Sequence, residues 1–378
     1  MKVVHVIAST ATEFGGPPRV ALDLARLSAA KGISTAIVTP DPREAPAHWP
    51  TSWDGSVAAL PSVVTMRDIA HGAEIARGAD VVHFHGVFNT MFVKLAKVLR
   101  AQGTPYIVTV HGMLDDWSMA QKQWKKRAYL MLGGRAFLEK AAFVHCTAQG
   151  ELDQSKKWFP NGREVVIPYL IDTQPYRELP GEAMAREKWA FLNDDSLVSV
   201  LFLSRLHYKK GPDVLIDAIA LAKAKGAKVR LVLAGDGDAP YPEQLKQQVA
   251  TRGILDITHF VGQVSGALKY SLYQVCDLFA LPTSQENFGL VYTESLASGT
   301  PVITTRGTDI WRELESSGGV KIVERSADAF ANAIVELAGN ASLREKMGSG
   351  APGWVLRTYD EGMLLGKFVS VYERAGKS

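Results

Sequence analysis

The chain has 378 residues, which is too long for one ordinary hydrophobic core and predicts two domains. Its composition, 47% hydrophobic and 21% charged, is that of a globular protein rather than a disordered or fibrous one. The 42 basic and 39 acidic residues give a net charge of +3, which offers no general reason to expect nucleic-acid binding.

In chain order, KVVHVIAS predicts a first β-strand, since its apolar core is too short for a signal peptide. PPRVALDLARLSAAKG follows as a helix that prolines open and Gly32 ends. ISTAIVTP, ADVVHFHG, PYIVTVHG, AAFVHCTA and REVVIPY predict further strands, with helices over about 89–102 and 118–140. Near-continuous apolar strands that alternate with helices are typical of a parallel sheet covered on both faces.

The alternation stops at 171–195, which is rich in proline and charge and predicts a linker after a first domain of residues 1–170. SLVSVLFLSRL, KVRLVLAGDG, DITHFVGQV, CDLFALPTS, TPVITTR and GVKIVE then predict a second doubly wound α/β domain over 196–352. The amphipathic segment 353–378 predicts a C-terminal helix that can pack on either domain. Ligands of such sheets bind beyond the carboxyl ends of the strands, so two facing domains would enclose one cleft.

Cys146 and Cys276 lie in apolar runs, which favours two reduced core thiols in a cytoplasmic protein over a disulfide. No run of 18 apolar residues occurs, so no membrane-spanning helix is expected. We expect the protein in the cytoplasm, or peripherally on the inner face of the cell membrane.

Two glutamates eight positions apart, Glu286 and Glu294, stand in a mostly apolar or small-residue run. Glu286 falls in a strand-to-helix loop, and Glu294 falls inside a helix predicted over about 288–298. The free amides at that helix start favour an anion, and Gly289 lets the backbone approach it closely. An anion site with one nearby acid and a second acid for hydroxyl groups fits a sugar nucleotide. Alternatively, Glu286 is only an N-terminal helix charge and Glu294 faces solvent.

Four segments in this half carry a resemblance: SRLHYKKGPDVLIDA, LVLAGDGD, FVGQV and the Glu-x7-Glu segment. In order and spacing they resemble the retaining glycosyltransferases of the GT-B fold, a family that includes bacterial polysaccharide and lipopolysaccharide sugar transferases. FGGPPRVALDLARLSAAKG looks like the family's N-terminal glycine loop, and TVHGMLDDWSMAQKQWKKRAYL resembles a subgroup of exopolysaccharide transferases. The resemblance covers roughly the full chain, most weakly over 41–79. It implies two Rossmann-like doubly wound domains that face a central cleft.

The resemblance also implies roles for individual residues. Arg205 and Lys210, whose charges a helix N-terminus does not favour, would hold the donor's diphosphate as the glycosidic bond breaks. Glu286 and His111 would lie near the donor sugar and complete the catalytic set, and Glu294 would bind the ribose. The full donor-binding set is Gly15, Gly16, Gly235, Gly237, Val261, Gly262, Asn287, Phe288, Gly289, Leu290 and Glu294.

On the acceptor side we expect His85, Asp115 and Asp116. Many relatives have aspartate directly after the histidine, where this chain has Gly112, so a general-base role for either aspartate is not assigned. His83 and His85 share a strand face, but no cysteine or carboxylate cluster accompanies them, and a metal site is not expected. GDGD at 235–238 fits the border of a nucleotide pocket better than a metal-binding Asp-x-Asp, so neither metal nor other cofactor is expected.

The sequence therefore predicts a retaining hexosyltransferase that moves a sugar from a nucleoside-diphosphate sugar to a polysaccharide, lipopolysaccharide or lipid-linked oligosaccharide. Alternatives are a sugar-nucleotide epimerase, a phosphorylase on the same scaffold, or a non-catalytic nucleotide-sugar-binding protein.

The stretch 121–140 has six basic residues against one acidic, interleaved with aromatic and aliphatic residues. It is either an ordinary surface helix with a core-facing stripe or a contact with an anionic membrane or lipid-linked acceptor. No nucleic-acid partner is expected.

Overall fold

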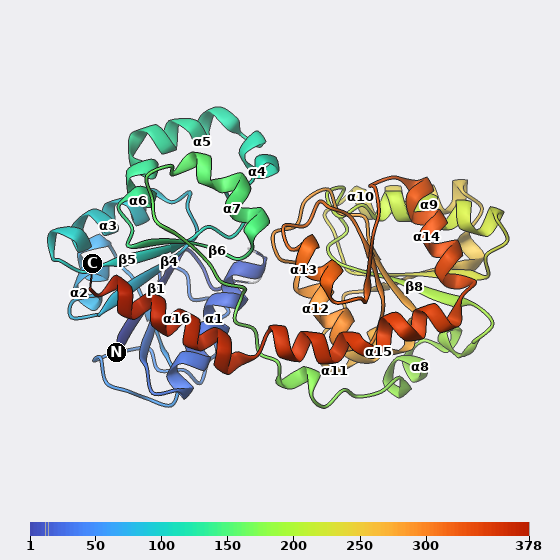
Figure 1. Ribbon diagram of the computed structural model, residues 1–378, viewed down its shortest axis with the longest axis horizontal. Helices are drawn as coiled ribbons and strands as arrows, with labels where there is room; N and C mark the ends of the chain where they lie inside the picture. Colours follow the sequence, from blue (N-terminus) through green and yellow to red (C-terminus); the bar gives the residue numbers. More distant parts are fainter. Residues whose placement is uncertain (12, 14, 378) are drawn as a thin grey trace. The chain divides into compact units, whose positions relative to one another are not determined.

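The computed structural model describes residues 1–11, 13 and 15–377, and the chain forms two compact α/β units (Figure 1). Unit 1 comprises Met1–Asp172 together with Tyr359–Ser378, and unit 2 comprises Thr173–Thr358. The expected fold class is confirmed, since each unit holds one wholly parallel sheet with helices between its strands.

Unit 1 contains a seven-stranded sheet in the order β3-β2-β1-β4-β5-β6-β7. Its strands are β1 (Lys2–Ile7), β2 (Ser34–Thr39), β3 (Ser62–Thr65), β4 (Val81–His85), β5 (Tyr106–Thr109), β6 (Phe143–Cys146) and β7 (Glu164–Val166). Its helices are α1 (Gly16–Ala30), α2 (Ile69–Ile75), α3 (Thr90–Ala101), α4 (Asp116–Ala120), α5 (Gln123–Tyr129), α6 (Arg135–Glu139), α7 (Gln149–Ser155) and α16 (Glu361–Ala375), with short η2 (Leu130–Gly134) and η3 (Lys156–Trp158). The sequence missed β3 and α2, which lie in the segment of weakest resemblance.

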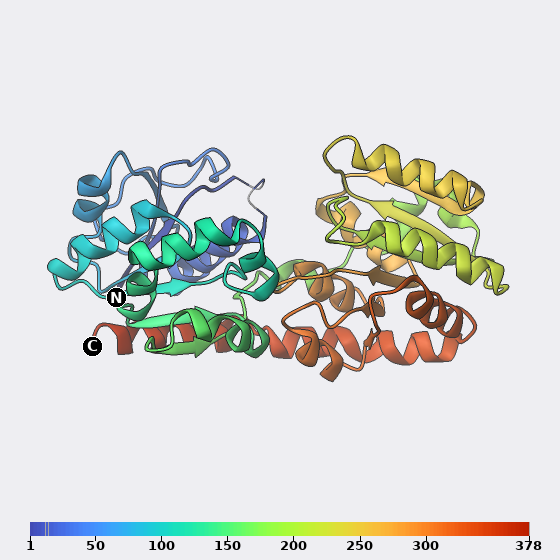
Figure 2. The same cartoon turned by 90° about the horizontal axis from the view of Figure 1, so that it is seen from above.

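Alternation along the strands divides unit 1 into two packing layers. Val4 and Val6 of β1 belong to the large core that includes α3, whereas Ile7 packs in a smaller core with residues of α1. The intervening His5 therefore points to the face that α1 and α16 cover, and Figure 1 shows α16 lying across this face while Figure 2 shows it on one side of the unit.

The segment 118–140, predicted as one helix, is broken into α4, α5, the π-helical turn η2 and α6. Lys122 adopts a left-handed backbone with φ of 50°, and Gly133 has φ of 129°. At Gly134 a Cβ would lie 2.3 Å from the Tyr129 ring, so the glycine pair permits a kink that larger residues would not. The prediction of a continuous helix was wrong because it followed apolar periodicity and ignored these two glycines.

Unit 2 contains a six-stranded sheet in the order β10-β9-β8-β11-β12-β13. Its strands are β8 (Val198–Leu203), β9 (Val229–Ala234), β10 (Thr258–Gly262), β11 (Leu278–Leu281), β12 (Val302–Thr304) and β13 (Val320–Ile322), each at a predicted position. Its helices are α8 (Ala183–Lys188), α9 (Pro212–Ala224), α10 (Tyr241–Thr251), α11 (Gly266–Val275), α12 (Leu290–Ala297), α13 (Trp311–Ser316), α14 (Ala327–Ala338) and α15 (Ala341–Thr358), with η4 (Gln174–Tyr176), η5 (Ala190–Asn193) and η6 (Leu255–Ile257).

The predicted linker 171–195 is largely part of unit 2 rather than a free connection. It folds into η4, α8 and η5, and α8 packs on α11. The Ser271 hydroxyl accepts a hydrogen bond from the Ala185 amide at 3.0 Å, and Gln274 accepts one from the Gly181 amide at 2.7 Å. At the other end of unit 2 the chain leaves after Thr358, not after 352, and α16 then packs on unit 1.

Both cysteines are free and buried, as predicted. Within residues 1–11, 13 and 15–377, no helix has the length and apolar character needed to cross a membrane.

Candidate active site

The predicted cationic and acidic residues of unit 2 lie on two neighbouring loops. β8 and β11 are adjacent in the sheet, but the chain runs outward from β8 to β10 on one side and from β11 to β13 on the other. The loops that follow β8 and β11 therefore diverge at the topological switch point, where doubly wound sheets bind ligands. The first loop carries Arg205 and Lys210, and the second carries Glu286.

Glycines let these loops lie against their neighbours. A Cβ on Gly235 would lie 1.9 Å from the Ser204 carbonyl oxygen, and a Cβ on Gly237 would lie 2.2 Å from that of Leu206. The loop after β9 thus packs directly on the loop that carries Arg205. This contact gives Gly235 and Gly237 a structural function, and their predicted contact with the donor stays a prediction.

Arg325, which the sequence did not single out, bridges the same loops from the segment after β13. It donates to the Pro282 carbonyl at 2.9 Å and to the Tyr208 carbonyl at 3.1 Å. A Cβ on Gly211 would lie 2.3 Å from the same Pro282 oxygen, and its φ of 75° is left-handed. Because Arg325 binds main-chain atoms, no sequence motif signals its function.

The Lys210 ammonium donates to the Glu286 carboxylate and joins the two loops. Burial, together with the neighbouring charges of Lys209 and Arg205, lowers the pKa of Lys210 to about 7. Arg205 itself is exposed and has no hydrogen-bond or ion-pair partner within the described part of the chain. The site thus holds an excess of positive charge that an anionic ligand would neutralise.

The start of α12 has the form predicted for it. Gly289 adopts a left-handed backbone with φ of 69°, and no side chain caps the helix. A Cβ at this position would lie 2.6 Å from the Tyr292 ring and 2.9 Å from Glu286 Cγ. Only glycine therefore fits beside Glu286, and the first amides of α12, beginning at Leu290, have no capping side chain.

Hydrogen bonds to the segment after β12 hold the rest of this loop in place. The Glu286 amide donates to the Gly307 carbonyl at 2.7 Å, and the Asp309 amide donates to the Glu286 carbonyl at 2.9 Å. Asn287 donates to the Asp309 carboxylate at 3.2 Å, and Phe288 is buried. Asn287 and Phe288 thus hold the loop in shape, whereas their contact with a donor is untested.

Glu294 lies inside α12 and is buried, so the alternative that it faces solvent is wrong. Lys269 of α11 donates to its carboxylate at 2.7 Å, and the Tyr273 hydroxyl lies 3.4 Å from it. The sequence missed Lys269 because the pair joins two helices, and neither helix reveals its neighbour through its own periodicity. A buried carboxylate with a cation beside it is suited to accept hydrogen bonds from hydroxyl groups.

At the edge of this sheet, Val261 stands at a bulge in β10, and Gly262 is exposed with φ of 71°. The Gly262 carbonyl accepts a hydrogen bond from the Gly235 amide at 2.8 Å. These residues therefore lie at the carboxyl end of β10, and their contact with the donor stays a prediction.

In unit 1 the switch point lies between β1 and β4. After β1, Gly15 and Gly16 begin α1 with Pro17 and Pro18, and no side chain caps this helix. A Cβ on either glycine would meet no atom of the described residues within 4 Å. Phe14, the first residue of the predicted glycine segment, lies outside the described residues.

His111 follows β5 with a left-handed backbone, φ 54°, which is uncommon for a residue other than glycine. The adjacent Gly112 has φ of 69°, and its amide donates to the buried Glu151 carboxylate. The Glu151 carboxylate also accepts from the Thr147 amide and hydroxyl, so it ties the loop after β5 to the loop after β6. This strained turn is the kind of backbone that accumulates at functional sites.

The acceptor-side residues fall in different environments. His85 is buried, and Asp115 is buried as the cap of α4, where it accepts from the Ser118 amide. Asp116 is exposed and pairs with Lys157. Asp115 therefore has a structural function as a helix cap, and contact of these three residues with an acceptor stays a prediction.

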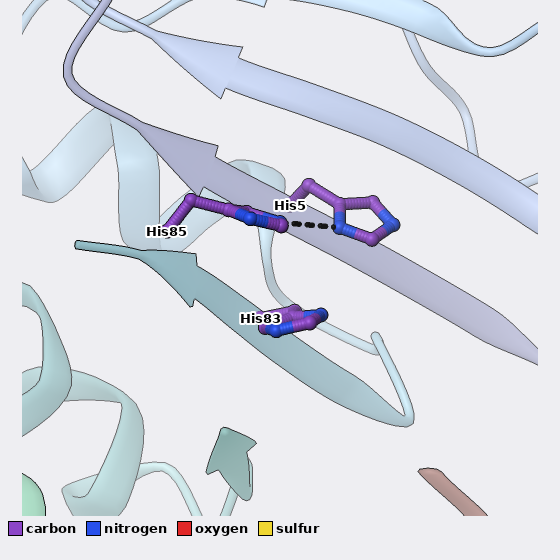
Figure 3. A group of neighbouring side chains, drawn as sticks. All are labelled: His5, His83 and His85. Carbon is purple, nitrogen blue, oxygen red and sulfur yellow. Dashed lines mark hydrogen bonds between the residues drawn. The ribbon is translucent and has the colours of Figure 1, made fainter. Parts of the chain in front are cut away.

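Among the described residues, His5, His83 and His85 form one buried group whose ligand-type atoms lie within 4.8 Å of one another (Figure 3). Both ring nitrogens of His83 and of His85 already have hydrogen-bond partners. A metal ion would have to break these bonds in a buried site, so the donor set does not suit one.

Comparison with known proteins agrees with this geometry. The family model described as glycosyl transferases group 1 matches residues 184–354, and the glycosyl transferase 4-like domain matches residues 15–169. An α-monoglucosyldiacylglycerol synthase of Streptococcus pneumoniae is 28% identical over 63% of this chain. The match covers 54% of that enzyme, so this chain spans about half of its length.

A GDP-mannose:cellobiosyl-diphosphopolyprenol α-mannosyltransferase of Xanthomonas campestris is 25% identical over 99% of this chain and 97% of its own. The structure of Anabaena HepE with UDP superposes with a TM-score of 0.76 at 18% identity, covering 98% of this chain and 99% of HepE. At that identity the superposition supports the fold alone. Taken with the two family matches, these similarities show that the chain belongs to the group 1 glycosyltransferases and has the GT-B fold.

Proposed function

We propose that this glycosyltransferase takes its sugar from a nucleoside-diphosphate sugar and transfers it with retention of anomeric configuration. The observation that carries the proposal is the junction of Arg205, Lys210 and Glu286 at the switch point of unit 2. Two cations beside uncapped helix amides suit a diphosphate, and Glu294 with Lys269 suits a ribose diol. Two similar proteins support this choice, because one is a GDP-mannose-dependent mannosyltransferase by name and the structure of the other is a complex with UDP.

In the proposed reaction the acceptor hydroxyl attacks the anomeric carbon from the side of the leaving group. The glycosidic C–O bond breaks, the nucleoside diphosphate leaves with the bonding electrons, and a donor phosphate oxygen takes the acceptor's proton. Arg205 and Lys210 stabilise the charge that develops on the leaving diphosphate, which lowers the barrier. No metal is assigned to this chemistry, and Glu286 holds Lys210 in position.

For the acceptor we propose a polysaccharide or lipid-linked saccharide, as in exopolysaccharide biosynthesis, met at an anionic membrane surface. Trp124 of α5 is 80% exposed, and Met131 and Leu132 of η2 are 81% and 87% exposed. Tyr129, the last residue of α5, packs against the core of unit 1, and Leu130, Phe137 and Leu138 are buried, so the stretch 121–140 also has the core-facing side of an ordinary surface helix. Four exposed cationic residues lie in the same stretch of the chain: Lys122, Lys125, Arg127 and Arg135. Exposed apolar residues that alternate with cationic ones are typical of a contact with anionic lipid.

The test is a donor screen followed by product analysis. Thermal shifts with UDP-, GDP- and ADP-sugars should identify one base that stabilises the protein, and an Arg205→Ala variant should lose that shift. Transfer to a lipid-linked saccharide should give a product whose anomeric proton coupling matches that of the donor. A product of opposite configuration would overturn retention, while phosphate-dependent cleavage or an epimerised nucleotide sugar would favour the alternative enzymes. Binding without any turnover would favour a non-catalytic protein.

A further inference from the structure

The face of unit 1 that α16 covers carries a hydrogen-bonded network of buried histidines on neighbouring strands. Register places His5 of β1 opposite His83 of β4, and His85 is two residues further along the same face. Burial lowers the pKa of every histidine in the network, so each ring is neutral and has one N–H and one lone pair. The members are His5, His83, His85, His111 and His145.

In one branch of the network, only one direction of hydrogen-bond donation satisfies every group. The Ile167 carbonyl only accepts, so His145 Nε2, at 2.7 Å, carries the hydrogen and Nδ1 accepts from the Thr109 hydroxyl at 2.8 Å. The Thr109 oxygen then accepts from His83 Nε2 at 2.6 Å, and His83 Nδ1 accepts from the Tyr372 hydroxyl at 2.9 Å. Every ring nitrogen in this branch has a partner of the right kind.

The second branch runs outward from His5 to Tyr169. His5 Nδ1 lies 3.0 Å from His85 Nε2, His85 Nδ1 lies 3.2 Å from His111 Nε2, and His111 Nδ1 lies 2.7 Å from the Tyr169 hydroxyl. Figure 3 shows the inner link, with the His85 ring edge directed at His5. The exposed fraction of these residues rises along the branch, from 0% at His5 to 8% at His111.

In this second branch, two opposite directions of hydrogen-bond donation are allowed. His5 Nε2 is buried without a hydrogen-bond partner in the described part of the chain. With neutral rings, either His111 and His85 donate inward from Nε2 while the hydrogen of His5 sits on its unpartnered Nε2, or all three histidines donate outward from Nδ1. Either direction leaves one unmet group at His5 Nε2, so the inner end does not decide between them. The direction of donation is therefore set at the outer end, by the hydrogen bond between His111 Nδ1 and the Tyr169 hydroxyl.

Within the described residues the branch ends at His5 Nε2. We propose that His85 and His5 are positioning residues for His111, which fix its ring and make the tautomers of all three histidines follow the hydroxyl of Tyr169. A ligand hydroxyl that replaced Tyr169 at His111 Nδ1 would set the tautomers in the same way. Only the effect on sugar transfer, tested by kinetics below, rests on the proposed function.

The direct test is ¹⁵N NMR of the histidine rings in the full-length protein, which reports the protonated nitrogen of each ring. Tyr169→Phe should shift the tautomer populations of His5, His85 and His111 together. His83 and His145 should keep the Nε2–H form, because their branch is separate. A change confined to His111, or no change in any ring, would overturn the proposal, as would stoichiometric zinc that is lost in a His5→Gln variant.

Kinetics give a second readout that does not depend on the NMR assignment. His85→Phe should lower kcat/KM by about tenfold, the equivalent of one buried hydrogen bond. Thr109→Val is the matched control, because it breaks the branch of His83 and His145 on β5, the strand beside that of His85. This variant should change kcat/KM less than about twofold. Equal losses in the two variants would mean that the network acts only through stability and would overturn the positioning function. If the tautomers respond as expected but no sugar transfer is found, the proposed function fails and the network assignment stands.

Discussion

Lys210 and Glu286 form an ion pair that joins the loop after β8 to the loop after β11. Both side chains are largely buried, and Arg205 adds a second, exposed cation nearby. Glu286 therefore holds Lys210 at the switch point, where an incoming diphosphate would share its ammonium group. Removal of either partner leaves the other charge buried and unpaired, so the pair matters for both stability and binding.

Lys210→Ala should lower kcat by about 10²–10³-fold, the range found when one electrostatic stabiliser of a transition state is lost. Lys223→Ala is the matched control, because Lys223 on the helix after the same loop makes an exposed ion pair with Asp256. Exposed pairs contribute little, so this variant should keep near-normal turnover. Circular dichroism should show that both variants stay folded, and a near-normal kcat in Lys210→Ala would remove its assigned function.

The pH dependence follows from the same lysine. Its pKa is lowered from 10.5 to about 7, mainly by burial. Only the ammonium form attracts a diphosphate, so kcat/KM for the donor should fall as pH rises through about 7. Lys210→Arg, whose charge persists at every working pH, should lose this decline whatever its absolute rate. An unchanged decline in that variant would assign the titration to another group.

The stability effect of Lys210 has the opposite sign to its effect on binding. Between about pH 7 and pH 10.5 the unfolded chain holds the proton of this lysine, while the folded chain has released it. The free energy of unfolding should therefore rise with pH across this window through this group. Urea denaturation of the wild type and Lys210→Arg at several pH values would isolate the contribution, which the arginine variant should lack.

Glu294 and Lys269 allow binding and stability to be separated. Glu294→Ala should raise the Kd for the donor by about tenfold, the equivalent of one or two hydrogen bonds, with a smaller effect on kcat. It should also destabilise unit 2 by about 3–5 kcal/mol, because it leaves Lys269 buried without its partner. The double variant Glu294→Gln, Lys269→Met should recover much of the stability without recovering donor affinity. Calorimetric titration with donor that shows unchanged affinity would break the ribose assignment.

Local pattern was enough to predict the strands of unit 2, because each is a short apolar run between turn signals. It also placed Glu286 in a loop and Glu294 in a helix, since the proline after β11 and Gly289 mark the boundaries. β3 was missed because its four residues lie among many turn residues and carry little periodicity.

The supporting contacts of the site could not be predicted, because they join segments far apart in the chain. Arg325 acts through the main-chain carbonyls of Pro282 and Tyr208, which any residue could supply. Similarly, the pairing of Lys269 with Glu294 depends on the packing of α11 on α12. Such contacts are set by tertiary packing, so periodicity within one element carries no signal for them.

The exposed apolar residues of α5 and η2 give the last prediction. Trp124→Ser with Leu132→Ser should reduce flotation with vesicles that contain anionic lipid, because each change removes apolar area from the membrane contact. Leu255→Ser is the matched control, since this leucine is 64% exposed on unit 2, outside the stretch 121–140. Binding of the wild type should weaken at high salt and on neutral vesicles, as expected for a contact that depends on lysine and arginine. Transfer to a short water-soluble acceptor should be retained by the double variant, because the substitutions lie outside the proposed catalytic set. If the double variant floated as well as the wild type, the cluster around Trp124 would not be the membrane contact.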